Sequence, residues 1–286
     1  MSKPIKHKNT CKMKTPEKEN MKPCGATFGS MERVRFLILF LLLATGFCLP
    51  RYDTAIRPGP PKPCKNSVVV THTGYTLSYN KTWHLADWVA YNLTAMETVP
   101  VVKRCNRFVP DPMLAAFTMS TDDYKNSGYD MGHLAAAADM CYSAATMTES
   151  FYLSNIAPQV PGFNRGIWKR LEEQVRCWSV GCSAVYVVTG PVFTKGMPAI
   201  GHGRIAVPAS FYKVIADYRE PGAKGIGFIM PNRNVKEPLQ HFAVTIDSVE
   251  RATGIDFFYQ WPGGLQRQIE SKVDVKRWIW VKTESQ

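Results

Sequence analysis

Residues 151–176 restrict the fold more than any other part of this chain. They read FYLSNIAPQVPGFNRGIWKRLEEQVR, an apolar run followed by an amphipathic one. Residues 151–156 are interpreted as a buried strand that Pro158 terminates. Asn155 is a polar residue inside this run, and a buried amide needs hydrogen-bond partners. We therefore expect the Asn155 side chain to be bonded to polar groups close by.

A helix is predicted from residue 164 onward. Asn164 is of the residue type that caps helix N-termini. One stripe of side chains repeats at helical spacing and predicts a buried face: Ile167, Leu171, Val175 and Trp178. A second stripe recurs every four residues beside it: Asn164, Trp168, Glu172 and Arg176. Taken singly, Asn164 is explained as a simple cap, and Glu172 with Arg176 as a surface ion pair.

A histidine precedes this segment in the stretch YDMGHLAAAADM, residues 129–140. His133 follows a glycine, and the small side chains after it favour close packing that fixes its backbone. A lone histidine is more often structural than catalytic, so this pair is a weak signal by itself. Farther upstream, residues 104–111 (RCNRFVPD) are interpreted as a surface loop, with contact to a phosphate backbone as the alternative.

The rest of the chain has the pattern of strands with few helices. β-branched and aromatic residues fill residues 67–80, 183–190, 204–218 and 224–231, with glycine and proline between the runs. Residues 245–253 predict a short helix that stops at Gly254. The composition, 45% hydrophobic, is sufficient for a packed core and argues against disorder. This order of elements indicates an α+β fold in a single domain, residues 67–286.

The first 66 residues have a different character. Residues 33–48 begin with a basic cluster and continue as an apolar run that is too short for a bilayer, which takes about 20 apolar residues. Residues 31–48 are therefore interpreted as a signal peptide. Residues 1–30 are a basic extension, either disordered or upstream of a true start at Met31. Residues 49–66 contain five prolines and are interpreted as an extended linker.

This N-terminal pattern predicts export. We expect a secreted or periplasmic protein that keeps no stable membrane span after signal cleavage. A lipoprotein attached through Cys48 and an uncleaved membrane anchor are the alternatives. In an exported protein disulfides can form, and Cys177 and Cys182 are close enough in sequence to be considered as a pair.

Charge and cysteine spacing restrict the function classes. The formal net charge is +12, and residues 1–48 carry nine basic and three acidic residues, so half of the excess lies there. The remainder suits a polyanionic partner without requiring one. The sequence contains no Cys-x-x-Cys pair and no His-Glu-x-x-His, which argues against a zinc ribbon and a zinc peptidase.

Taken together, these features resemble one known family. A histidine after glycine, a run ending in Ser-Asn, an asparagine opening a helix and a glutamate two turns later are similar to the DNA/RNA non-specific endonucleases. The resemblance covers roughly residues 71–258 and is most specific in residues 151–176. It implies a ββα-metal (His-Me finger) core with a mixed, mainly antiparallel central sheet flanked by helices.

The resemblance also implies a role for each site residue. His133 corresponds to the general base that deprotonates the attacking water, and Asn164 to the only protein ligand of a hydrated Mg²⁺, for which Mn²⁺ can substitute. Asn155 supports the site through hydrogen bonds. Glu172 holds the water shell of the metal, and Arg176 steadies the phosphate or the leaving product. A near-neutral imidazole and a hard divalent cation suit this chemistry.

One position departs from the family motif, Asp-Arg-Gly-His. Met131 stands where the motif has arginine, and methionine cannot contact a phosphate as a cation. The loss of one such donor is expected to cost on the order of 10²-fold in rate. Other basic side chains are expected to compensate in part: Arg165, Lys169 and Arg176.

The sequence thus predicts an exported, Mg²⁺-dependent, sugar-non-specific endonuclease that binds the backbone of DNA and RNA and leaves 5′-phosphate ends. A homodimer is a further expectation from the resemblance. Two alternatives stay open: a catalytically weakened or inactive nucleic-acid-binding descendant, and an exported structural α+β module.

Overall fold

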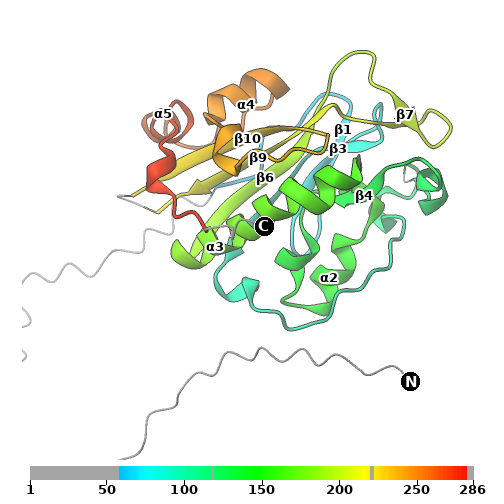
Figure 1. Cartoon of the computed structure of the whole chain (residues 1–286), viewed down its shortest axis with the longest axis horizontal. Helices are drawn as coiled ribbons and strands as arrows, with labels where there is room; N and C mark the ends of the chain where they lie inside the picture. Colours follow the sequence, from blue (N-terminus) through cyan, green and yellow to red (C-terminus); the bar gives the residue numbers. More distant parts are fainter. Residues whose placement is uncertain (1–57, 118, 220–221, 282–286) are drawn as a thin grey trace, which may run out of the picture. The chain divides into compact units, whose positions relative to one another are not determined.

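The runs of β-branched and aromatic residues form one large sheet. In the computed structural model, which describes residues 58–117, 119–219 and 222–281, seven strands join in the order β1–β2–β3–β6–β9–β10–β11 (Figure 1). They are β1 (Ser67–Thr71), β2 (Thr76–Asn80), β3 (Leu85–Thr94), β6 (Ala184–Val192), β9 (Ser210–Asp217), β10 (Lys224–Pro231) and β11 (Ala243–Val244). Neighbouring strands of this sheet are antiparallel. The predicted α+β class with a mainly antiparallel sheet is confirmed.

Both faces of the sheet are covered. Along β6, Val185 and Val187 point into one hydrophobic cluster, and Tyr186 and Val188 point into a second one on the opposite face. The first cluster contains the apolar side of α3 (Lys169–Gly181), and the second contains α4 (Ile246–Thr253) and α5 (Gly263–Glu270) (Figure 1). Burial on both sides explains why this strand reads as a continuous apolar run.

The remaining elements are short. One further α-helix is α2 (Ala144–Ser150). A two-residue pair, β7 (Ala199–Ile200) with β8 (Ile205–Ala206), lies in a connection between β6 and β9. The 3₁₀ helices are η2 (Met96–Thr98), η3 (Pro112–Leu114), η4 (Thr121–Tyr124), η5 (Ala137–Met140), η6 (Leu153–Asn155), η8 (Leu239–Phe242) and η9 (Val275–Arg277).

Two strands outside the main sheet carry the predicted histidine. β4 (Asp130–His133) pairs antiparallel with β5 (Ile156–Gln159). The strand predicted over residues 151–156 is wrong in its limits, because Phe151 ends α2 and residues 153–155 form η6. Pro158 lies within β5, opposite Met131, and does not terminate it. A two-stranded ladder tolerates this proline because every strand in it is an edge.

The predicted helix begins differently from the expectation. A π-helical turn, η7 (Phe163–Trp168), precedes α3, and Gly166 is non-helical at φ −102° and ψ −109°. The N-cap is Gly162, so the expectation that Asn164 caps the helix is wrong. The predicted buried stripe is confirmed, with each side chain at most 2% exposed: Ile167, Leu171, Val175 and Trp178. The predicted helix at residues 245–253 is also confirmed, since Thr245 caps α4 and Gly254 ends it at φ +72°.

The predicted basic extension, the signal peptide and the first part of the linker, up to residue 57, lie outside the described residues. From Gly59 onward the proline-rich segment lies against the domain, where Tyr186 donates to the Gly59 carbonyl at 2.8 Å. Across the described ranges, no helix combines the length and apolar character that a membrane span needs. The considered Cys177–Cys182 disulfide is absent, because both cysteines are free.

Candidate active site

The backbone of His133 is held between two strands and a helix. His133 is the last residue of β4 and stands opposite Ile156 of β5. At Gly132, just before it, a Cβ atom would overlap the side chain of Gln159, so a larger residue requires that buried side chain to move. The Trp168 indole, where η7 meets α3, donates to the His133 carbonyl at 3.3 Å. The two strands and the helix form the ββα unit that the resemblance implies.

The imidazole of His133 lies in an aromatic environment. Its ring centroid is 4.8 Å from that of Phe151, edge-on at 82°, and 5.5 Å from that of Phe108. The side chain is 7% exposed, and its Nε2 has no hydrogen-bond partner among the described residues. Burial, and secondarily the charge of Arg104, lower the pKa of His133 from 6.5 to about 3. The imidazole is therefore neutral at physiological pH.

Asn155 fixes the chain that follows His133. Its Oδ1 accepts from the Ala135 N–H at 2.8 Å, and its Nδ2 donates to the carbonyls of Ala135 and Ser150 at 2.9 and 2.8 Å. The residue is fully buried, so these bonds satisfy groups that water cannot reach. The expected hydrogen-bond partners are present, and Asn155 positions the backbone beside the histidine.

Asn164 is oriented by Asp130 at the other end of β4. The Asn164 Nδ2 donates to Asp130 Oδ2 at 2.8 Å, which leaves its Oδ1 available to a ligand. Arg165 donates to both oxygens of the same carboxylate, at 2.6 and 2.8 Å. Burial alone would raise the pKa of Asp130, but the hydrogen bonds from Arg165 and Asn164 outweigh it and hold the pKa below its usual value. Asp130 thus remains ionised and keeps the Asn164 amide in one orientation.

Glu172 lies one turn into α3 and interacts with a buried lysine. Burial raises the pKa of Glu172, and Lys213 on β9 is the strongest opposing charge. Lys213 is 1% exposed, donates to Thr189 Oγ1 at 2.6 Å and lies 4.7 Å from the ring centroid of Trp168. No sequence interpretation singled out Lys213. A single lysine inside the apolar strand FYKVIAD was the available signal, because a buried lysine requires a partner.

Arg176 is bonded to a buried carboxylate. Its Nη1 donates to Asp139 Oδ1 at 2.8 Å, and Tyr91 donates its hydroxyl to Asp139 Oδ2 at the same distance. The expected surface ion pair between Glu172 and Arg176 does not form, since Asp139 of η5 is the partner instead. This bond fixes the arginine at the edge of the site.

The loop interpreted as an ordinary surface segment reaches the site as well. Arg104 lies with its guanidinium carbon 4.9 Å from the ring centroid of Phe151, and its charge acts on both His133 and Glu172. Arg104 and Arg176 line one cavity of about 250 Å³ together with small residues such as Ala137. Two arginines that line one cavity suit an anionic group.

The residues present fit a single hydrated divalent cation. The Asn164 Oδ1 is a hard oxygen ligand, and Glu172 accepts no hydrogen bond from any described residue. The described residues here form no group of three clustered carboxylates, histidines or cysteines, so a fully protein-coordinated metal is not built at this place. One amide ligand with a carboxylate behind it matches a metal that keeps most of its waters.

The comparison with known sequences decides the family. A family model described as DNA/RNA non-specific endonuclease matches residues 53–263. The chain belongs to the DNA/RNA non-specific endonuclease family. It is accordingly a metal-dependent, hydrolytic endonuclease that acts on nucleic acid.

Individual members of this family are similar over most of the domain. Nuclease C1 of Cunninghamella echinulata var. echinulata is 37% identical over 226 residues, which cover 73% of this chain and 89% of the relative. Mitochondrial endonuclease G of Bos taurus is 37% identical over 202 residues, covering 65% of this chain and 68% of the relative. A crystal structure of an EndoG/EndoGI complex superposes with a TM-score of 0.64 at 36% identity, covering 70% of this chain and 88% of that one.

Within this endonuclease the basic side chains expected to replace the motif arginine are already engaged. Arg165 is bonded to Asp130, Arg176 to Asp139, and Lys169 lies 3.8 Å from Glu173. Arg104 has no carboxylate partner among the described residues and bonds only to Asn106 Oδ1, at 2.8 Å. It is the better candidate for the missing phosphate contact.

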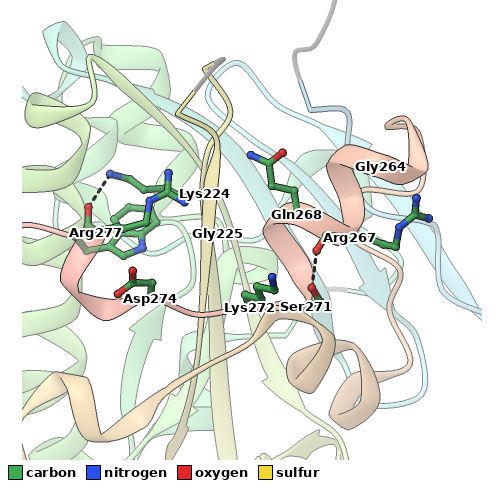
Figure 2. A pocket seen from close by; sticks show the side chains of 10 residues that line it. Lys224, Gly225, Gly264, Arg267, Gln268, Ser271, Lys272, Asp274 and Arg277 are labelled. Atoms are coloured by element: carbon green, nitrogen blue, oxygen red, sulfur yellow. Dashed lines mark hydrogen bonds between the residues drawn. The ribbon is translucent and has the colours of Figure 1, made fainter.

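A separate cavity lies elsewhere in the described part of the endonuclease. It has a volume of about 540 Å³ and is formed by the start of β10, by α5 and by η9 (Figure 2). Its charged lining residues are Lys224, Arg267, Lys272, Asp274 and Arg277. None of the predicted site residues lines it, so this cavity does not mark the candidate active site.

Proposed function

We propose that this family member is an exported, Mg²⁺-dependent, sugar-non-specific endonuclease that cleaves DNA and RNA and leaves 5′-phosphate ends. One observation carries the proposal: the β4–β5 pair and the η7–α3 helix hold His133 and Asn164 on one rigid unit. Export is supported by the signal-like residues 31–48. We also propose that the protein is a homodimer, and sedimentation equilibrium tests this through the molar mass in solution.

His133 serves as the general base in this proposal. Its neutral imidazole takes a proton from water at Nε2, the atom that has no hydrogen-bond partner among the described residues. The Phe108 ring packs against the imidazole. The loop that carries Phe108 must therefore move away from His133 when substrate enters. The aromatic rings around His133 limit its contact with water molecules other than the attacking one.

Asn164 and Glu172 hold the metal region. Mg²⁺, when bound, neutralises charge that develops on the phosphate and on the leaving oxygen. Asn164 would offer its Oδ1 as the protein ligand, because its Nδ2 is already bonded to Asp130. Glu172 accepts hydrogen bonds from water at the metal. Mn²⁺ is expected to substitute, since it prefers the same oxygen ligands.

Arginines hold the phosphate. Arg104 and Arg176 line one cavity, and the charge of Arg104 acts on His133. Both arginines contact neighbouring groups, Phe151 and Asp139 respectively. Contacts of this kind read the backbone and not the base edges, which accounts for cleavage without sequence or sugar specificity.

A supercoiled-plasmid nicking assay and a matched assay on single-stranded RNA test this function. Purified protein with Mg²⁺ is expected to cleave both substrates, and EDTA or His133→Ala is expected to abolish cleavage. His241→Ala, an exposed histidine on η8, is the matched control and should retain full activity. If nucleic acid binds without any metal-dependent cleavage, the proposal fails and the binding-only alternative holds. If His133→Ala retains the wild-type rate, His133 is not the general base and that part of the proposal fails.

A further inference from the structure

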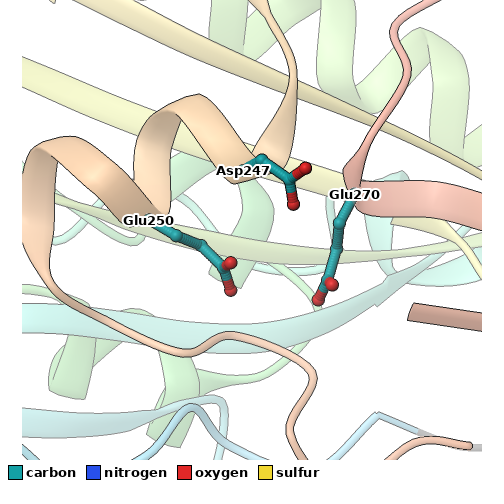
Figure 3. Close-up of side chains that lie close together, drawn as sticks. All are labelled: Asp247, Glu250 and Glu270. Atoms are coloured by element: carbon teal, nitrogen blue, oxygen red, sulfur yellow. The ribbon is translucent and has the colours of Figure 1, made fainter. Parts of the chain in front are cut away.

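Three carboxylates meet between two helices on the face of the sheet opposite α3. Asp247 and Glu250 lie one turn apart on α4, and Glu270 is the last residue of α5 (Figures 1 and 3). Oxygens from all three lie within 4.8 Å of one another. Figure 3 shows the side chains reaching from the two helices into the space between them. None of these residues belongs to the active site described above.

Glu270 is the buried member of this cluster, and one of its carboxylate oxygens has no hydrogen-bond partner among the described residues. Its side chain points into the cluster, the residue is only 7% exposed, and the oxygen without a partner is Oε1. A buried carboxylate oxygen without a donor is costly unless a proton or a cation satisfies it. Glu250 is only partly satisfied, through one bond from the Phe257 N–H at 3.0 Å.

The side chains around the cluster do not neutralise the negative charge of its three carboxylates. Asp256, in the connection between the helices, adds a further negative field to Glu250 and Glu270. Arg251 on α4 is the basic side chain that acts on the cluster, and it donates to Ser248 at 2.8 Å. Across the described ranges no ion pair involves Glu270 or its two neighbours. Burial first, and then the charges of Glu250, Asp247 and Asp256, raise the pKa of Glu270 to about 7.

We propose that Asp247, Glu250 and Glu270 form a structural Ca²⁺ site that joins α4 to α5. Ca²⁺ takes six to eight oxygens at about 2.3–2.6 Å, so two of its ligands can lie up to about 5 Å apart. The spacing of the three carboxylates fits within that limit without movement of either helix. Mg²⁺ needs ligands at about 2.0–2.1 Å in a strict octahedron, which would draw the oxygens closer together. The half-exposed Asp247 and Glu250 leave room for water to complete the coordination.

The site has a defined structural consequence. Glu270 ends α5, and the chain then continues through η9 and residues 278–281 to α3, where the Ile279 carbonyl accepts bonds from Gln174 and Trp178 at 2.9 and 2.6 Å. A cation at Glu270 fixes the point from which this segment departs. Glu270 also lies beyond residue 263, where the family match ends.

Thermal unfolding of EDTA-treated full-length protein tests the proposal. Ca²⁺ at about a hundred times its Kd is expected to raise the Tm of the wild type by roughly 5–10 °C. Glu270→Gln, which keeps the shape and removes the charge, is expected to lose this rise. Asp247→Asn is a second variant at a more exposed position and should weaken Ca²⁺ binding in calorimetry. Asp122→Asn, an exposed acid on η4, is the matched control and should keep the full rise.

Asn164→Ala separates this site from the catalytic metal. It removes the proposed active-site ligand, so a Ca²⁺-dependent rise in Tm that persists in this variant supports a second site. The inference is overturned if the wild type shows no such rise, if Glu270→Gln keeps it, or if Mg²⁺ produces it and Ca²⁺ does not. Loss of Mg²⁺-dependent cleavage bears on the active site alone, so failure of one proposal is distinguishable from failure of the other.

Discussion

At the scale of single residues, Arg104 is the side chain whose importance the structure changes most. It lies on a loop that sequence patterns interpret as ordinary surface, yet its charge acts on His133 and Glu172. We expect Arg104→Ala to lower the cleavage rate on the order of 10²-fold, because it removes a preorganised cation next to the phosphate. Plasmid nicking measures the rate, and the neighbouring exposed Arg107→Ala is the control. Equal rates in the two variants would show that Arg104 makes no phosphate contact.

Met131 is the second residue whose effect on rate is testable. It lies half-buried on β4 and packs against the core on one side. Met131→Arg restores the cation of the family motif, and we expect a higher cleavage rate with an unchanged requirement for Mg²⁺. Initial rates of plasmid nicking at fixed Mg²⁺ measure this change, with Met131→Lys as a charge-matched comparison. An equal or lower rate in Met131→Arg would indicate that Arg104 already provides the contact.

The burial of His133 predicts a pH dependence of stability. Its pKa is about 3 in the folded protein, against 6.5 ordinarily, so the unfolded chain binds a proton that the folded chain does not. The free energy of unfolding should therefore fall as the pH drops from about 6.5 toward 3, by at most ~1.4 kcal/mol per pH unit from this group. Urea unfolding at several pH values measures the slope in the wild type and in His133→Ala. The same slope in both proteins would contradict the assignment.

At the scale of elements, the short helix η6 holds the site through one side chain. Asn155→Ala removes three buried hydrogen bonds, two to Ala135 and one to Ser150. We expect a loss of roughly 3–5 kcal/mol in the free energy of unfolding, because the groups left behind stay buried and unpaired. Urea denaturation measures this loss. Asn92→Ala, an exposed asparagine with one bond from Tyr218, should cost about 0.5 kcal/mol or less.

The elements also show which parts of the fold local sequence can predict. Strands of the main sheet and the apolar stripe of α3 follow from residue patterns, because burial on defined faces imposes their spacing. The start of α3 does not, since Asn164 bonds to Asp130 from a strand 34 residues away instead of capping its own helix. Likewise, Asn155 bonds to the carbonyls of Ser150, at the end of α2, and of Ala135, which lies 20 residues away. Such contacts depend on the tertiary fold, so they cannot be predicted from the helix and strand propensities of neighbouring residues.

At the scale of the whole molecule, the active site depends on side chains from many separate parts of the chain. His133, Asn164 and Glu172 could be singled out as candidates because a motif carries them. Lys213 and Asp139 could not, because they approach from a distant strand and a 3₁₀ helix and belong to no local pattern. Two residues of the four-residue stripe, Trp168 and Glu172, have their partner on β9: Lys213 lies 4.7 Å from the Trp168 ring centroid, and its charge acts on Glu172.

The segment after residue 263, beyond the family match, completes the packing of α3. Trp278 is 2% exposed, and its ring centroid lies 4.7 Å from that of Trp178, on the helix that carries Glu172. Trp278→Ala should lower the free energy of unfolding by about 3–5 kcal/mol, because it leaves a large cavity against α3. Ile279→Ala is the adjacent control, since that side chain is 79% exposed and its carbonyl, which accepts the bonds from α3, is retained. Urea unfolding of the two variants measures the difference. A similar small loss in both would mean that the C-terminal segment lies on the helix without stabilising it, whereas the expected contrast makes this segment a structural part of the nuclease domain.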